Sequence, residues 1–303
     1  MQMLQSSQAQ AVKKAVKIVL LIVIALVIAA IVWGIVAPLL GIGSMTFGWQ
    51  DYRYDETGYT VGEGTIPNDH ITSIDLDWVD GRIEIVACGD TFISLTESAD
   101  SELPDSARLR WRVDENGVLS IKYRKSSWFL GFGHENRNKT LILRIPERLL
   151  PTLKLLDVEA VSADVTVTEI SVSTFDYENV SGNLTARGVN FGACDLEAVS
   201  GDLKIEDSNV GSAEIELVSG DLQLSSFDCP ASLDIESVSG NAELWLPENA
   251  SFTLDHETTS GRLISDFSMK TLSDRYVCGE GKSTFRVETV SGSLILAQNN
   301  DAD

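Results

Sequence analysis

The sequence is poor in the residues that carry most enzyme chemistry. It contains three histidines, His70, His134 and His256, and it has no H-E-x-x-H, G-x-S-x-G or glycine-rich phosphate-binding motif. The usual arrangements for metal-dependent hydrolysis, serine hydrolysis and phosphoryl transfer are therefore missing. We predict that the protein is not an enzyme and has no bound cofactor. A carbohydrate-cleaving β-helix enzyme stays open as a distant alternative, which would need a pair of carboxylates in a cleft.

Cysteine is also scarce. Cys88, Cys194, Cys229 and Cys278 are widely spaced and form no C-x-x-C pair, which argues against a zinc knuckle and against a redox motif. We favour buried thiols that act as small apolar side chains. The sequence leaves the disulfide state open.

Basic residues are few, and they are unevenly placed. Residues 1–37 hold three lysines and no acid, which leaves 20 basic and 45 acidic side chains, a formal charge of −25, for the rest of the chain. Eleven of those 20 basic residues fall within residues 108–154. Phosphate binding needs a basic footprint, so we do not expect a nucleic acid partner.

One long apolar run lies near the start of the chain. Residues 18–37 read IVLLIVIALVIAAIVWGIVA without a charge, and 20 helical residues at ~1.5 Å each span ~30 Å of hydrocarbon. A cleaved signal peptide usually has an apolar region of only ~7–15 residues, so we predict an uncleaved membrane helix over residues 18–40. Lys13, Lys14 and Lys17 before the helix place residues 1–17 in the cytoplasm and the rest outside the cell.

The remaining chain repeats itself. Residues 194–224 read CDLEAVSGDLKIEDSNVGSAEIELVSGDLQL, in which V-S-G-D-L begins at Val199 and again at Val218. With the Val of this motif as position zero, an upstream copy begins at Val79, and the later copies begin at Val161, Val180, Val199, Val218, Val238, Thr259 and Val290.

Each copy has the pattern of two strands joined by a tight corner. Apolar residues alternate with polar ones on both sides of the motif, and the alternation slips by one residue at V-S-G. Glycine accepts the positive φ that such corners often need. The predicted corner glycines are Gly182, Gly201, Gly220, Gly240, Gly261 and Gly292.

A unit of about 19 residues cannot bury its own apolar edge, but a stack of such units can. We therefore predict an all-β fold, a parallel β-solenoid of seven to eight rungs over residues 71–297, in which Leu203 lies on Leu222. Residues 41–70 are a predicted linker and residues 298–303 a C-terminal tail. A β-sandwich is the alternative, although it does not require the same residue at the same place in every copy.

Two columns of each copy are acidic. Glutamate recurs two positions before the zero position, and Asp or Glu recurs four positions before it in every tandem copy except the last, which has Arg286. The simpler interpretation is a solvated face that prevents aggregation. The alternative interpretation is a surface that binds Ca²⁺ or a cationic partner. The residues of this candidate cation ladder are Asp176, Glu178, Asp195, Glu197, Glu214, Glu216, Asp234 and Glu236.

The repeated V-S-G-[DN]-L, the leading SIDLDWVDGRIEIV, the mid-chain LILRIPERLL and the apolar N-terminal run together resemble a bacterial β-strand-repeat family labelled "putative adhesin", a domain of unknown function. The resemblance covers residues 71–297. It implies a non-enzymatic envelope protein, and it transfers no catalytic residue. We expect a single-pass membrane protein whose extracellular domain binds an unidentified protein or envelope polymer. The alternative is an envelope-stress or regulatory accessory protein that senses cationic agents or partners at the membrane.

Overall fold

The structure, a computed structural model, describes residues 54–67, 70–126, 138–272 and 275–299. Nearly all regular structure in these ranges is β-strand, so the all-β prediction is confirmed. No helix within them has the length and apolar character needed to cross a membrane. The predicted membrane helix, residues 18–40, and the cytoplasmic segment before it lie outside the described residues.

The strands run along almost the whole described chain. In order they are β1 (Thr60–Val61), β2 (Gly64–Ile66), β3 (Ser73–Cys88), β4 (Ile93–Ser98), β5 (Arg110–Val113), β6 (Val118–Lys122), β7 (Thr140–Pro146), β8 (Leu155–Thr168), β9 (Ser171–Ser181), β10 (Leu184–Arg187), β11 (Asn190–Ser200), β12 (Leu203–Ser219), β13 (Leu222–Ser226), β14 (Ser232–Ser239), β15 (Ala242–Pro247), β16 (Phe252–Ser260), β17 (Leu263–Ser265), β18 (Met269–Leu272), β19 (Arg275–Cys278), β20 (Ser283–Ser291) and β21 (Leu294–Asn299). Two short 3₁₀ helices, η1 (Asp105–Ala107) and η2 (Glu147–Thr152), interrupt them. The predicted linker therefore includes β1 and β2, which belong to the folded domain.

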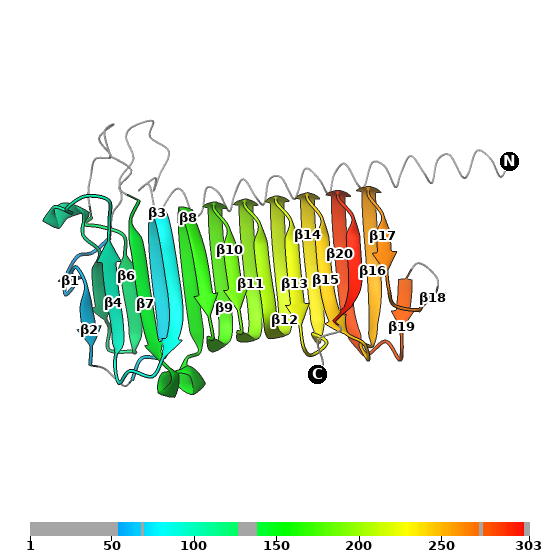
Figure 1. The fold of residues 1–303 in the computed structure, drawn as a ribbon, viewed down its shortest axis with the longest axis horizontal. Coiled ribbons are helices and arrows are strands. Elements are labelled where there is room, and N and C mark those ends of the chain that lie inside the picture. The colour runs from blue at the N-terminus through cyan, green and yellow to red at the C-terminus, as the bar shows by residue number, and fades with distance from the viewer. Residues whose placement is uncertain (1–53, 68–69, 127–137, 273–274, 300–303) are drawn as a thin grey trace.

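The strands form an elongated stack, seen along its side in Figure 1. Each layer of the stack has a first arm, which ends at the V-S-G corner, and a second arm, which follows it. The first arms pair in parallel in the order β6, β3, β8, β9, β11, β12, β14, β20, β16. The second arms pair in parallel in the order β7, β3, β8, β10, β12, β13, β15, β21, β17.

The repeats stack in the register that the period of the motif requires. Leu203 pairs with Leu222 on the second arms, as predicted, and Leu196 pairs with Ile215 on the first arms. These side chains are fully buried between the arms. Each repeat thus supplies one layer of a continuous apolar core, and the pair β6 and β7 adds a layer that lacks the motif.

At both ends of the stack the layer order differs from the chain order. The upstream copy, β3, lies between β6–β7 and β8, although four strands, β4 to β7, separate β3 from β8 in the sequence. At the other end β20 lies between β14 and β16, and β21 lies between β15 and β17. The second-to-last layer at each end is therefore formed by the first or the last copy of the motif, as the red strand between yellow and orange strands in Figure 1 shows.

Antiparallel strands cover the two ends. β5 and β1 extend the first arms at the N-terminal end, and β4 and β2 extend the second arms. At the other end the β18–β19 hairpin, which falls in the long interval before the last copy, pairs with β16 at Thr253 and Leu254. Such covers protect open strand edges from pairing with other chains.

The corners explain the glycine of the motif. Gly182, Gly201, Gly220 and Gly240 have φ between +133° and +144°, and Gly292 has φ +158°. Gly261 lies at the corner between β16 and β17 but is absent from the residues with positive φ, so that expectation fails for it. A Cβ at any of these glycines would lie 1.8–2.2 Å from a backbone carbonyl oxygen of the neighbouring layer. Close backbone approach therefore requires glycine at these six corners, including Gly261, whereas Ala163 holds the corresponding position in the β8 layer.

The residue after the corner glycine forms a ladder of its own. The side-chain oxygen of Asn183 accepts a hydrogen bond from the backbone N–H of Asp202 at 2.9 Å, and Asp202 accepts one from Asp221 at 2.9 Å. Asp221 accepts one from Asn241 at 2.7 Å in the same way. This repeated bond gives a structural reason for the Asp or Asn of V-S-G-[DN]-L.

Candidate functional site

The acidic columns of the sequence lie on the outer face of the first arms. We call the column four positions before the motif valine the Asp row and the column two positions before it the Glu row. Asp195 pairs with Asp176 and Glu214, and Glu197 pairs with Glu178 and Glu216, so both rows are in register from layer to layer. Asp234 and Glu236 continue the rows on β14. The structure thus brings together all eight residues of the candidate cation ladder.

The rows are longer than the candidate ladder. Asp157 and Glu159 extend them onto β8, and Asp75 and Asp77 extend them onto β3. The sequence analysis did not single out the two β3 residues, although they stand four and two positions before Val79. Their position relative to the upstream copy of the motif is the signal that identifies them.

A cation lies near each end of the rows, although Asp255 and Glu257 on β16 continue them past Arg286. At the N-terminal end the ammonium group of Lys122 on β6 forms ion pairs with Asp75, at 3.3 Å, and with Asp77. At the other end the Arg286 guanidinium contacts Asp234 at 3.1 Å, Glu236 at 2.7 Å and Glu288 at 2.6 Å. Each cation compensates the carboxylates of the layers next to it.

The middle layers have no such compensation. Among the described residues, no Lys or Arg forms an ion pair with the acids of the four layers from β8 to the second half of β12, which are Asp157, Glu159, Asp176, Glu178, Asp195, Glu197, Glu214 and Glu216. Neighbouring layers are ~4.8 Å apart, a separation at which like charges repel by ~1 kcal/mol even in water. The folded domain therefore holds a line of mutually repelling carboxylates.

Burial and repulsion together change the acidity of these groups. Partial burial, with neighbouring carboxylates, raises the pKa of Asp157, Glu159 and Glu197 to about 7. The same causes raise the pKa of Glu178 and of Glu216. The charge of the middle layers therefore depends on pH near neutrality.

Two further columns border the acidic rows. On one side, small residues at Thr174, Ala193, Ser212, Ser232 and Thr284 leave a shallow trench of about 520 Å³ beside the Asp row. On the other side the motif valines form a partly exposed row, which we call the valine row: Val79, Val161, Val180, Val199, Val218, Val238 and Val290. The outer face of the first arms is thus acidic along its middle, with a hollow on one side and an apolar row on the other.

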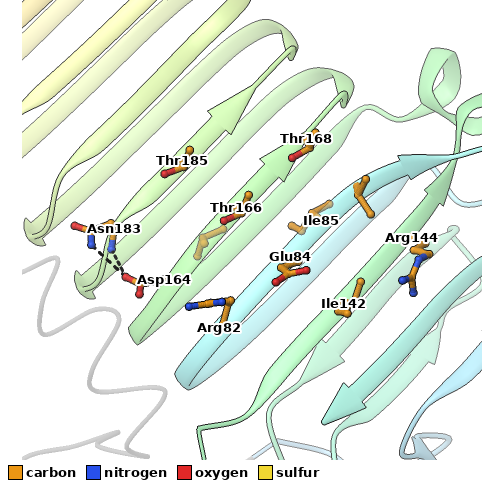
Figure 2. Close-up of a pocket in the computed structure, with 12 residues that line it drawn as sticks. Arg82, Glu84, Ile85, Ile142, Arg144, Asp164, Thr166, Thr168, Asn183 and Thr185 are labelled. Atoms are coloured by element: carbon orange, nitrogen blue, oxygen red, sulfur yellow. Dashed lines mark hydrogen bonds between the residues drawn. The ribbon is translucent and has the colours of Figure 1, made fainter. Parts of the chain in front are cut away.

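The outer face of the second arms has a different character. A hollow of about 460 Å³ there is lined by Arg82, Glu84, Arg144, Thr166 and Thr185, among others. Figure 2 shows these side chains on neighbouring strands, with the hydrogen bonds from Asn183 to Asp164 at the corner. Charges of both signs and hydroxyl groups mix on this face, and no residue type repeats along it as the acids do on the other. The acidic face is therefore the stronger candidate for a functional surface.

The acidic rows do not form a preassembled metal centre. Across the described ranges, no group of three or more His, Cys, Asp or Glu side chains is arranged to hold a metal ion. All four cysteines are free thiols, and Cys194 and Cys278 are buried. Whether the rows bind cations from solution stays a prediction for experiment.

The chain is similar to known proteins in sequence pattern and in fold. The model of the Toastrack DUF4097 family matches residues 71–296. Similar solved structures are a putative cell adhesion protein from Clostridium sporogenes (14% identity, 79% of this chain and 100% of that one, TM-score 0.38), a putative adhesin from Bacteroides fragilis (12%, 79% and 97%, 0.45) and a putative adhesin from Parabacteroides distasonis (14%, 80% and 98%, 0.39). No curated protein sequence matches this chain.

Proposed function

Because the chain belongs to the Toastrack DUF4097 family, we propose that it is a membrane-anchored cell-surface β-repeat protein that acts by binding, without catalysis. The observation that carries this proposal is the acidic face, with eight carboxylates in four successive layers that form no ion pair with a described Lys or Arg. A partner that supplies positive charge relieves their repulsion when it binds. The trench beside the Asp row gives room for ammonium or guanidinium groups.

The test of the acidic face uses the full chain in nanodiscs of zwitterionic lipid. A short fluorescent lysine homopolymer is the probe, and binding is followed by anisotropy with empty nanodiscs subtracted. Changing Glu178, Glu197 and Glu216 together to Gln should weaken binding by about tenfold, and raised salt should weaken binding to the wild type. The matched control is Glu243→Gln, on the second arm. Equal binding to the triple variant and the wild type would contradict the proposal.

The membrane placement rests on the apolar run and on Lys13, Lys14 and Lys17 before it. Protease added to intact cells should then digest residues after about 50 and leave the anchor with its lysines. Protection of the β domain until the membrane is permeabilised would place it on the cytoplasmic side.

A second candidate function is that of an envelope-stress or regulatory accessory protein that senses cationic agents at the membrane. Carboxylates with a pKa of about 7 in the middle layers favour it, because their charge responds to small changes near neutral pH. Cells that carry the triple Gln variant should then lose their transcriptional response to a cationic agent and keep normal attachment. Loss of attachment alone would favour the first function.

A further inference from the structure

The acidic rows and the valine row lie side by side along the stack. Glu197 and Val199 stand two residues apart on β11, and the same pair recurs on β12 as Glu216 and Val218 and on β14 as Glu236 and Val238. Residues two apart on one strand point to the same face and lie ~6.6 Å apart. The outer face of the first arms therefore presents a strip in which negative charge and apolar surface run in parallel.

The chain itself shows what this strip accepts at its N-terminal end. There the Lys122 ammonium lies on the carboxylates of Asp75 and Asp77 in the acidic rows. A cation of the chain thus lies on the acidic rows in the first layers of the strip.

The same two rows continue past these layers, and in the four layers from β8 to β12 no described Lys or Arg forms an ion pair with the acids. Val199, Val218 and Val238 are partly exposed, and the Glu row beside Val199 and Val218 has no ion pair with a described Lys or Arg. We propose that a cationic amphipathic helix of a partner docks along this strip, with Lys or Arg side chains on the acidic rows and apolar side chains on the valine row. This inference rests on the proposed function and names the class of its partner.

The spacing of the layers favours a helix over an extended peptide. Layers repeat every ~4.8 Å, so five layers advance ~19 Å from the first to the last. One face of a helix repeats every ~5.4 Å and advances ~22 Å over four turns, whereas one face of a strand repeats every ~6.6 Å and advances ~26 Å over the same four steps. Over these four steps an extended peptide falls out of register with the layers by more than one layer spacing. A helix differs from the layers by only about half a layer spacing. A helix ~10 Å wide also covers the Glu row and the valine row together.

The test compares two peptides on the full chain in zwitterionic nanodiscs. One peptide is a helix of about 18 residues, ~27 Å long, with lysines along one face and leucines along the adjacent face. The other has the same composition in scrambled order, with no such faces. The wild type should bind the amphipathic peptide about tenfold more tightly than the scrambled one, as read by anisotropy with empty nanodiscs subtracted.

Variants of the valine row separate this inference from the proposed function. Changing Val199, Val218 and Val238 together to Thr keeps strand propensity and removes the apolar row, so it should weaken amphipathic binding about tenfold and leave binding of the lysine homopolymer unchanged. The same three positions changed to Ile should bind as the wild type does, and circular dichroism checks that both variants fold. Unchanged binding of the amphipathic peptide to the Thr variant, or equal binding of the two peptides, would contradict docking of a helix. The proposal that the acidic face binds cationic partners would be unaffected by either result. Failure of the triple Gln variant to weaken either probe overturns both.

Discussion

The corner glycines show that the stack leaves no room for one additional carbon atom, a Cβ, at the corner. A Cβ at Gly220 would lie 1.9 Å from the carbonyl oxygen of Gly201, and the φ of Gly220 is +136°. The clash is with backbone, which cannot move without disturbing the next layer. The sequence analysis identified these glycines from their place in the motif, but it expected a conformational role alone. Contact between layers is a tertiary property, and no pattern within one repeat reports it.

Gly220→Ala should therefore lower the free energy of unfolding by about 2–3 kcal/mol, measured by urea denaturation. Gly89→Ala is the matched control, because an added Cβ there meets no atom within 4 Å and Gly89 has no positive φ. The control should change stability by less than about 0.5 kcal/mol. Similar losses in the two variants would show that the close approach at the corner is not what the glycine serves.

The Asp and Asn side chains beside the corner give a second residue-scale prediction. The Asp202 side chain accepts a hydrogen bond from the backbone N–H of Asp221 in the neighbouring layer. Asp202→Ala removes this acceptor and should cost about 1 kcal/mol, whereas Asp202→Asn keeps an oxygen in place and should cost less than half as much. Thermal denaturation of the two variants measures the difference. If the two variants had the same melting temperature, the side-chain ladder would contribute nothing to stability.

At the scale of the strands, the acidic rows predict an unusual pH dependence. Burial and like charges raise the pKa of Glu159 and Glu197 to about 7 in the folded domain, above the ~4.3 expected for Glu in an unfolded chain. The folded state therefore binds protons more tightly, and this stabilisation is present below about pH 4 and is lost as pH rises through 7. The melting temperature should fall as pH rises from about 5.5 to 8.

Changing Glu159 and Glu197 together to Gln should flatten that slope. The variant should melt about 2–4 °C above the wild type at pH 8, the response of a domain of this size to about 1 kcal/mol after screening by water and salt. Glu243→Gln, on the second arm, is the control and should leave the slope as it is. A wild type that becomes more stable between pH 5.5 and 8 would contradict the assignment.

The candidate cation ladder makes a separate prediction for the same strands. No described cluster of acids is arranged as a metal centre, so millimolar Ca²⁺ should raise the melting temperature of the full chain by less than about 1 °C. A larger shift that disappears in the triple variant of Glu178, Glu197 and Glu216 would instead identify the rows as a divalent site.

Much of this face could be predicted from the strand pattern. The period of the motif and the alternation around each copy place Asp195 and Glu197 on one outward face and stack them on Glu214 and Glu216. Arg286 was already visible as the one cation in the Asp column, but Lys122 could not be predicted, because it is brought to Asp77 only by the pairing of β6 with β3.

For the whole molecule, the sequence indicates repeats but not the order in which they stack. A regular spacing favours layers in chain order, and the longer intervals between Val79 and Val161 and between Thr259 and Val290 are the signs of a departure. The interval holds the β18–β19 hairpin, and the chain then returns to place β20 between β14 and β16. Which layer a returning strand enters depends on the fit of whole layers, and no local pattern encodes it.

This order predicts which strands exchange their amide hydrogens slowly. The amides of β20 and β21, the last two strands before the C-terminus, lie between ladders on both sides and should be strongly protected. The amides of β17, which pairs on one side with β21, should exchange about tenfold faster or more. Faster exchange in β20 and β21 than in β17 would mean that the last copy lies at the end of the stack.

The position of β20 and β21 also determines how the domain carries mechanical load. Tension applied at the end of β21 loads that strand in shear against β15 on one side and β17 on the other, so pulling it out breaks two ladders together. A stack in chain order would be peeled from its last layer, one ladder at a time. A pull on the end of β21 is therefore resisted by two ladders at once, and the layers stay closed under a load that would peel a terminal layer.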